Sequence, residues 1–108
     1  MSLIKLNKHE VYQLIRENLS WFESRWDTNK MIYHSRSDIE CEINTLWRKE
    51  YNKDHNADYR DPTYDPPTAL LYGSTLTAMV HDGVLERYRE TEKEVYRYRP
   101  ILPIDDNY

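Results

Sequence analysis

The segment from Asn7 to about Arg25 has the apolar period of an amphipathic helix. Its apolar residues recur three or four positions apart and therefore share one face: Val11, Leu14, Ile15, Leu19 and Phe22. Asn7 and Glu10 have the spacing of a capping box, in which each side chain accepts a hydrogen bond from the other residue's backbone N–H. The pattern predicts a first helix over residues 7–25.

A second helix is predicted from about Asp38 to Tyr51. Its apolar stripe consists of Ile39, Ile43, Leu46 and Trp47. Ser37 and Glu40 again have the spacing of a capping box and would begin this helix. Between the two helices, residues 30–34 (KMIYH) have a short β-like pattern.

Residues 52–67 are polar, contain three prolines and show no apolar period, which indicates a long loop. Four acidic or amide residues have the spacing of positions one, three, five and twelve of an EF-hand calcium loop: Asp54, Asn56, Asp58 and Asp65. Tyr59, however, stands where such a loop needs glycine. A solvated acidic loop without calcium is the better interpretation.

A third helix is predicted from Asp65 to Asp82. Asp65 can cap it, Pro66 suits its first turn, and Gly83 is a natural residue to follow its end. The apolar residues of this helix should be buried in one core with those of the first two helices and the hairpin. The predicted core residues are Leu14, Ile15, Ile43, Leu46, Leu76, Met79, Val80 and Leu85.

Residues 84–89 and 94–99 (VLERYR and EVYRYR) are joined by a charged turn, and together they predict a β-hairpin. Residues 100–108 contain two prolines and are predicted to form an extended tail. The fold class is therefore α+β: a single domain over residues 1–99, with three helices, a C-terminal hairpin and a long loop between helices two and three.

Composition supports an ordered domain. The chain has 108 residues, which is the length of one domain, and its ten tyrosines and three tryptophans argue against disorder. A single cysteine, Cys41, excludes an intrachain disulfide and is typical of a reducing compartment. The first residues lack the apolar core of a signal peptide, so a cytoplasmic location is expected. No stretch has the roughly 18 apolar residues that a membrane span needs, so no membrane partner is expected.

The stretch from Leu76 to Arg99 resembles the recognition-helix and wing segment of winged helix-turn-helix domains. The resemblance rests on a helix that ends in Asp82 and Gly83, and on the residues after it: Val84, Leu85, Arg87, Val95 and Tyr96. It implies a small transcriptional regulator that binds double-stranded DNA, tightly only as a dimer, and acts without a cofactor. The third helix would lie in the major groove and the hairpin, as the wing, against the backbone.

The resemblance and the residue types single out a set of candidate DNA contacts: Ser74, Thr75, Thr77, His81, Arg87, Arg89, Lys93, Arg97 and Arg99. Serine and threonine can reach bases, and arginine and lysine neutralise phosphates. The hairpin carries five cationic against four acidic side chains, so cross-strand Glu–Arg pairing on a solvated hairpin is an alternative.

Two features favour a different function, that of a winged-helix protein-interaction module. The net charge is −4, and residues 66–82 contain no lysine or arginine, although phosphate contacts supply much of the affinity for DNA. Trp21, Phe22 and Trp26 crowd the end of the first helix, and an exposed part of this group would serve a homodimer or another protein partner.

No pattern in the chain indicates catalysis. The four histidines and Cys41 lack the spacing of metal ligands, and a chain with only two glycines has no glycine-rich phosphate loop. No pair of carboxylates stands out by its spacing as an acid and base. We therefore expect no enzyme activity, no metal and no cofactor.

Overall fold

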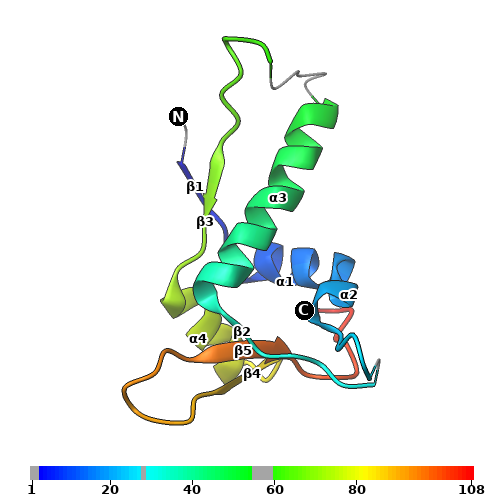
Figure 1. Ribbon diagram of the computed structural model, residues 1–108, viewed down its shortest axis with the longest axis vertical. Coiled ribbons are helices and arrows are strands. Elements are labelled where there is room, and N and C mark those ends of the chain that lie inside the picture. The colour runs from blue at the N-terminus through cyan, green and yellow to red at the C-terminus, as the bar shows by residue number, and fades with distance from the viewer. Residues whose placement is uncertain (1–2, 28, 55–59) are drawn as a thin grey trace.

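The computed structural model describes residues 3–27, 29–54 and 60–108, which form four helices and two small sheets (Figure 1). Along the chain the elements are β1 (Leu3–Lys5), α1 (Lys8–Glu17), α2 (Leu19–Phe22), β2 (His34–Ser35), α3 (Arg36–Asp54), β3 (Thr68–Leu70), α4 (Gly73–His81), β4 (Leu85–Tyr88) and β5 (Arg97–Pro100). The α+β class is confirmed, with four helices where three were predicted.

The predicted hairpin is present, but its second strand is shifted: residues 94–99 were predicted, and the structure has β5 at Arg97–Pro100, with Val95 and Tyr96 in the connection. β4 and β5 pair antiparallel with Leu85 opposite Pro100 and Arg87 opposite Tyr98, and β2 adds to the other edge of β5. The sheet order is β2-β5-β4. Leu85, Tyr98 and Pro100 are buried, and the helices cover this face of the sheet (Figure 1). The predicted strand over residues 30–34 is shorter in the structure, where only His34 belongs to β2 and Met31 forms an isolated bridge with Glu23.

The first helix begins as predicted and ends earlier. Both hydrogen bonds of the capping box form, from the Glu10 N–H to Asn7 Oδ1 (2.9 Å) and from the Asn7 N–H to Glu10 Oε1 (3.2 Å). The predicted span of 7–25 is wrong, because Asn18 leaves the helical conformation at φ −132° and separates α1 from α2. Its side chain instead donates to Glu42 Oε1 on α3. The helix is thus interrupted at a residue whose side chain is bonded to α3.

The second helix is longer than predicted. It begins at Arg36 and ends at Asp54, so the first three residues of the predicted 52–67 loop are helical. The Ser37–Glu40 capping box is wrong, because Ser35 Oγ accepts the hydrogen bond from the Asp38 N–H at 3.2 Å and Ser37 lies inside the helix.

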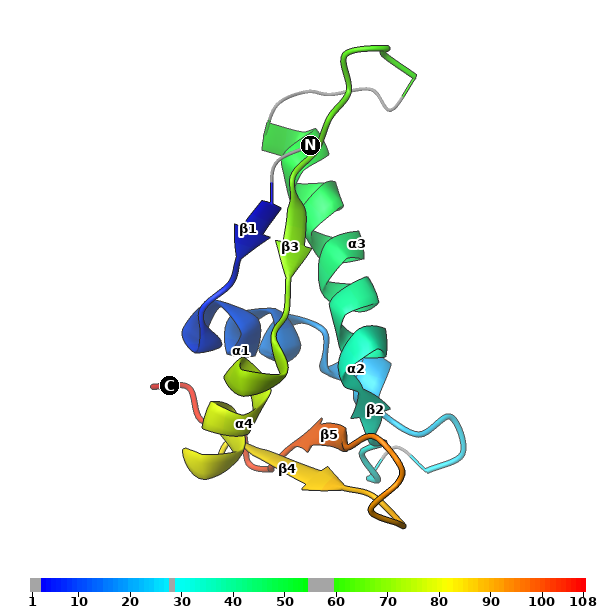
Figure 2. The same ribbon diagram turned by 90° about the vertical axis from the view of Figure 1, so that its left-hand side faces the viewer.

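The predicted start of the third helix at Asp65 is wrong. Residues 68–70 form β3, which pairs parallel with β1, and α4 starts only at Gly73 (Figure 2). The other side of β3 is held by α3: the Asn44 side chain donates to the Ala69 carbonyl (2.9 Å) and accepts from the Ala69 N–H (2.8 Å). Because β1 and α3 are distant in sequence, no local pattern predicts this strand.

The described part of the predicted loop, residues 60–67, runs from the far end of α3 back to β3 (Figure 1). The Tyr64 hydroxyl donates to Asn52 Oδ1 at 2.7 Å and ties the loop to the last turn of the helix. Two of the four calcium-loop positions, Asn56 and Asp58, lie outside the described residues.

The core contains most of the predicted residues. Leu76, Met79 and Leu85 are buried together with Ile15 and Ile43, as predicted. Three other predicted core residues are only half-buried at its edge: Leu14, Leu46 and Val80. Further buried residues come from elements that the sequence did not predict, among them Leu6, Ala69 and Leu71 beside the β1–β3 pair.

The C-terminal tail folds back onto α1. Pro100 belongs to β5, and Ile104 and Tyr108 pack against the core. Arg16 donates to the Asp106 carbonyl (3.1 Å), and the Tyr12 hydroxyl accepts from the Asp105 N–H (3.0 Å). These contacts make residues 101–108 part of the packed structure.

Truncation of the α4 side chain that lies deepest in the core tests this packing. Leu76 is 0% exposed, so Leu76→Ala should lower the free energy of unfolding by about 2–5 kcal/mol. Chemical denaturation gives this value, and Ser74→Ala on the exposed side of α4 is the matched control. A loss below about 1 kcal/mol for Leu76→Ala would contradict this packing.

The two glycines give a second test. Gly83 has φ +80°, a conformation that costs an L-residue about 1–2 kcal/mol, whereas a Cβ on Gly73 meets no atom within 4 Å. Gly83→Ala should therefore lower the melting temperature, and Gly73→Ala should leave it unchanged or raise it. Equal effects of the two substitutions would exclude a strained turn at Gly83.

Candidate nucleic-acid interface

The outward side of α4 is uncharged. Leu76 and Met79 point into the core, so the polar residues lie on the rest of the helix surface: Ser74 and His81 are exposed, and Thr75 and Thr77 are half-buried. The helix contains no aspartate, glutamate, lysine or arginine. It therefore offers hydroxyl and methyl groups without charge.

The first turn of α4 lies beside a cation that sequence reasoning missed. Tyr72 is the N-cap residue, its side chain makes no capping hydrogen bond, and the Lys5 ammonium lies 5.0 Å from the centroid of its ring. A helix N-terminus carries unpaired N–H groups and partial positive charge. Lys5 reaches this position only through the pairing of β1 with β3, and its sequence neighbourhood carries no signal of it.

Arg87 lies on the face of the hairpin that the helices cover, whereas Arg89 follows the last residue of β4 and also lines the hollow on the outer face. Residues directly opposite each other in an antiparallel pair share a face, and Arg87 is opposite the buried Tyr98. The two guanidinium groups lie 4.3 Å and 4.2 Å from the centroid of the Tyr96 ring. One tyrosine, just before the start of β5, thus contacts both cations.

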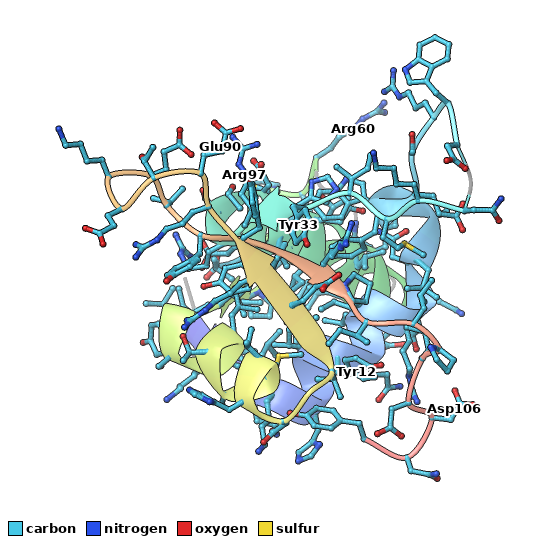
Figure 3. The ribbon with its side chains drawn as sticks, turned by 90° about the horizontal axis from the view of Figure 1, so that it is seen from below. Tyr12, Tyr33, Arg60, Glu90, Arg97 and Asp106 are labelled. Atoms are coloured by element: carbon cyan, nitrogen blue, oxygen red, sulfur yellow. The ribbon has the colours of Figure 1, made fainter. Side chains whose placement is uncertain are left out.

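Arg97 and Arg99 lie on the opposite face of the hairpin, with Tyr88 and Glu86 as their cross-strand neighbours. Arg99 is ion-paired with Glu86, donates to the Met31 carbonyl at 3.0 Å, and stacks on the Tyr33 ring. Figure 3 views the molecule from this side, with Arg97 and Tyr33 labelled. The structure therefore places Arg87 on one face and Arg97 and Arg99 on the other, with Arg89 at the edge between them. Lys93 is exposed in the turn between the strands.

The acidic residue at the end of α4 is neutralised. Asp82 Oδ2 accepts hydrogen bonds from Lys8 Nζ (2.8 Å) and from the Tyr108 hydroxyl (2.7 Å). These bonds lower the pKa of Asp82. The pKa of Tyr108 is raised, mainly by burial and to a smaller extent by its hydrogen bond to Asp82. The carboxylate that could repel a phosphate near α4 thus has its own cation.

The predicted aromatic group at the end of the first helix does not form one surface. Phe22 is buried, and Trp21 stacks on His34 with ring centroids 3.8 Å apart. Trp26 is 95% exposed and belongs to the following loop. Of the three residues, only Trp26 is fully available to a partner.

His34 is confined by its neighbours. Its ring lies between Trp21 and Phe22, and its Nε2 is buried without a hydrogen-bond partner among the described residues. Burial lowers the pKa of His34 below its ordinary value of 6.5, against smaller opposing effects of the Trp21 backbone and Asp38. The folded state therefore favours the neutral ring.

The described residues contain no group of three or more His, Cys, Asp or Glu side chains that could hold a metal ion. None of the described helices combines the length and the apolar character of a membrane span. Cys41 is a free, exposed cysteine on α3. No protein-family model, curated protein or solved structure matches the chain.

The state of His34 makes stability depend on pH. Below 6.5 the unfolded chain takes up a proton that the folded chain resists, so the free energy of unfolding should fall as the pH drops from 6.5 towards the lowered folded pKa. Above 6.5 the full contribution is present. His34→Phe keeps an aromatic ring and should reduce this dependence, as measured by denaturation between pH 7.5 and about 5. His81→Gln, at an exposed histidine, should leave it unchanged, and equal slopes for both variants would refute the role of His34.

Proposed function

We propose that the protein is a winged-helix domain that binds double-stranded nucleic acid through α4 and the helix-facing side of the β4–β5 hairpin. The observation that carries the proposal is the position of Arg87 and Arg89. Both guanidinium groups lie over Tyr96; Arg87 is on the face of the sheet that α4 covers, and Arg89 is at its edge, just after β4. Two preorganised cations beside an uncharged helix match a protein that places a helix in the major groove and contacts phosphates from a wing.

The topology supports this reading of the fold. When β1, α2 and β3 are set aside, the remaining elements follow the order helix, strand, helix, helix, hairpin: α1, β2, α3, α4, β4 and β5. β5 lies between β2 and β4 in the antiparallel sheet, so the hairpin is anchored beside α4. The same arrangement also serves protein-interaction modules, so the charges of the surface decide between the two.

The distribution of charge favours nucleic acid at this surface. The described part of the acidic loop, residues 60–67, lies at the end of the molecule opposite the hairpin (Figure 2). The N-terminal turn of α4 has Lys5 beside it, and Asp82 at the other end is paired with Lys8. Although the chain has a net charge of −4, α4 itself contains no carboxylate, and the one at its C-cap is paired.

The roles of the side chains follow from their places. Arg87, Arg89 and Lys93 contact phosphates and set affinity, because guanidinium and ammonium groups neutralise the backbone without reading sequence. Ser74, Thr75, Thr77 and His81 on α4 meet base edges, where hydroxyl and methyl groups discriminate weakly. Recognition of this kind makes the protein a regulator with modest sequence preference.

A salt series of binding to random duplex DNA tests the proposal. Each phosphate contact contributes about −0.9 to the slope of log K against log salt concentration. Arg87→Ala and Arg89→Ala should each flatten the slope by about 0.9, because each removes one contact. Arg97→Ala on the opposite face of the hairpin is the matched control and should leave the slope unchanged. Thr77→Ala should alter sequence preference more than overall affinity.

Two outcomes would contradict the proposal. If no salt-dependent binding to any duplex occurs at low ionic strength, the interaction-module function replaces it, since an α4 without lysine or arginine also fits a protein partner. If Arg97→Ala flattens the slope as much as Arg87→Ala does, the nucleic acid also contacts the outer face of the hairpin, and the proposed binding surface is wrong.

A further inference from the structure

Trp26 is a highly exposed side chain in the segment between α2 and β2. The loop after α2 is closed by the Glu23–Met31 bridge and by the Ser24 N–H bond to the Lys30 carbonyl (2.9 Å). Ser24 Oγ accepts from the N–H groups of Trp26 and Asp27, both at 3.2 Å. These bonds fix the backbone at Trp26 while its indole stays 95% exposed.

A groove of about 330 Å³ lies on the outer face of the hairpin, between the strands and the end of the same loop. Its apolar lining is exposed to solvent: Val95 is 72%, Tyr88 49% and Ile32 40% exposed. The Tyr33 ring packs on the Tyr88 ring. We call this the outer groove. Three of the large exposed apolar side chains of the described residues therefore line one hollow.

We propose that the outer groove receives Trp26 of a second copy of this chain, and that two copies exchange these side chains about a twofold axis. The loop that presents Trp26 leads directly into Ile32 and Tyr33, which line the groove. Each copy therefore carries both an exposed indole and a hollow, and a twofold arrangement satisfies both at once. A groove of 330 Å³ is large enough for an indole ring.

The charges around the two features are complementary. Trp26 is flanked by the exposed Arg25 and Asp27. The charged residues of the outer groove are two glutamates and two arginines: Glu90, Glu94, Arg89 and Arg97. Figure 3 shows Glu90 and Arg97 close together on this side of the hairpin. Insertion of Trp26 brings one cation and one carboxylate, Arg25 and Asp27, to a rim that offers partners for both. A surface with both signs around an apolar centre suits a copy of itself.

The size of the contact sets the expected affinity. A buried aromatic side chain removes roughly 150–250 Å² from water, so two indoles supply about 300–500 Å². Stable interfaces bury about 1,200–2,000 Å², and the groove lining and loop must supply the rest. We therefore expect a dissociation constant in the micromolar range.

Sedimentation equilibrium from about 1 µM to 1 mM, without nucleic acid, tests the proposal on the full chain. The wild-type protein should be in monomer–dimer equilibrium, and Trp26→Ala should raise the dissociation constant by roughly 30-fold or more, as for a central aromatic residue. Because Trp26 is 95% exposed, the Trp26→Ala variant should have the same melting temperature as the wild-type protein at low concentration. Leu3→Ala removes an equally accessible apolar side chain elsewhere and should leave the equilibrium as it was.

Two further variants test the pairing itself. Val95→Arg places a charge in the outer groove and should abolish dimerisation, yet a mixture of Val95→Arg with Trp26→Ala retains one intact Trp26–groove contact and should form a weak heterodimer. Arg25→Glu and Glu90→Arg should each weaken the dimer, and the double variant should restore it.

Three results would overturn the proposal. One is a monomer throughout the concentration range, and another is a dimer that survives Trp26→Ala. The third is a monomer whose Trp26 fluorescence is quenched by oligo-dT, because Trp26 would then stack on nucleic-acid bases. None of these results depends on duplex binding by α4, so failure here leaves the proposed function standing.

Discussion

The position of α4 depends on a few polar side chains of α3 that take the place of a neighbouring strand. β3 pairs with β1 on one side only, and its other side would leave buried backbone groups without partners. Asn44 satisfies both backbone groups of Ala69, and Glu40 Oε2 accepts from the Leu71 N–H (2.9 Å). Arg36 donates to the Leu71 carbonyl (2.9 Å) and pairs with Glu40. Since α4 begins two residues after Leu71, these bonds fix where the helix starts.

The hairpin is placed by a different constraint, the alternation of side chains along a strand. Leu85, Tyr98 and Pro100 must face the helices because they are buried, and this decides the direction of every other side chain in the two strands. Arg87 therefore shares the face of α4, and Arg97 and Arg99 face away. A shift of one residue in the pairing would exchange the two sets and give the outer face the cations that α4 now has beside it.

The sequence predicted the parts of the fold that rest on local signals. The capping box of Asn7 and Glu10 and the glycine turn at Gly83 need only neighbouring residues, and both occur where they were expected. β1, β3 and the late start of α4 depend on contacts between distant residues, so Asp65 and Pro66 suggested a helix start that tertiary pairing overrides.

The same limit applies to the candidate site. The sequence shows which residue types α4 carries. It also shows that Arg87 and Arg89, like Arg97 and Arg99, are two positions apart in a strand and so share a side of it. It does not show which side of one strand lies on the same face as which side of the other. Only the register, with Arg87 opposite Tyr98, places Arg87 and the second pair on different faces. Lys5 was missed because it is distant from α4 in sequence, and Phe22 and Trp26 could not be told apart because burial is a property of the folded chain.

A two-stranded ribbon with different chemistry on its two faces can serve two partners at once. On the helix-facing side Tyr96 holds a cation, and on the outer side Tyr33, Tyr88 and Val95 leave an open apolar hollow. The proposed dimer contact therefore leaves α4 uncovered. A single subunit has few cations near this helix, so its affinity for a duplex is limited. Two subunits joined through their outer faces would double the number of phosphate contacts of the proposed site without placing a basic residue on α4, which relates the exposed Trp26 to the proposed function.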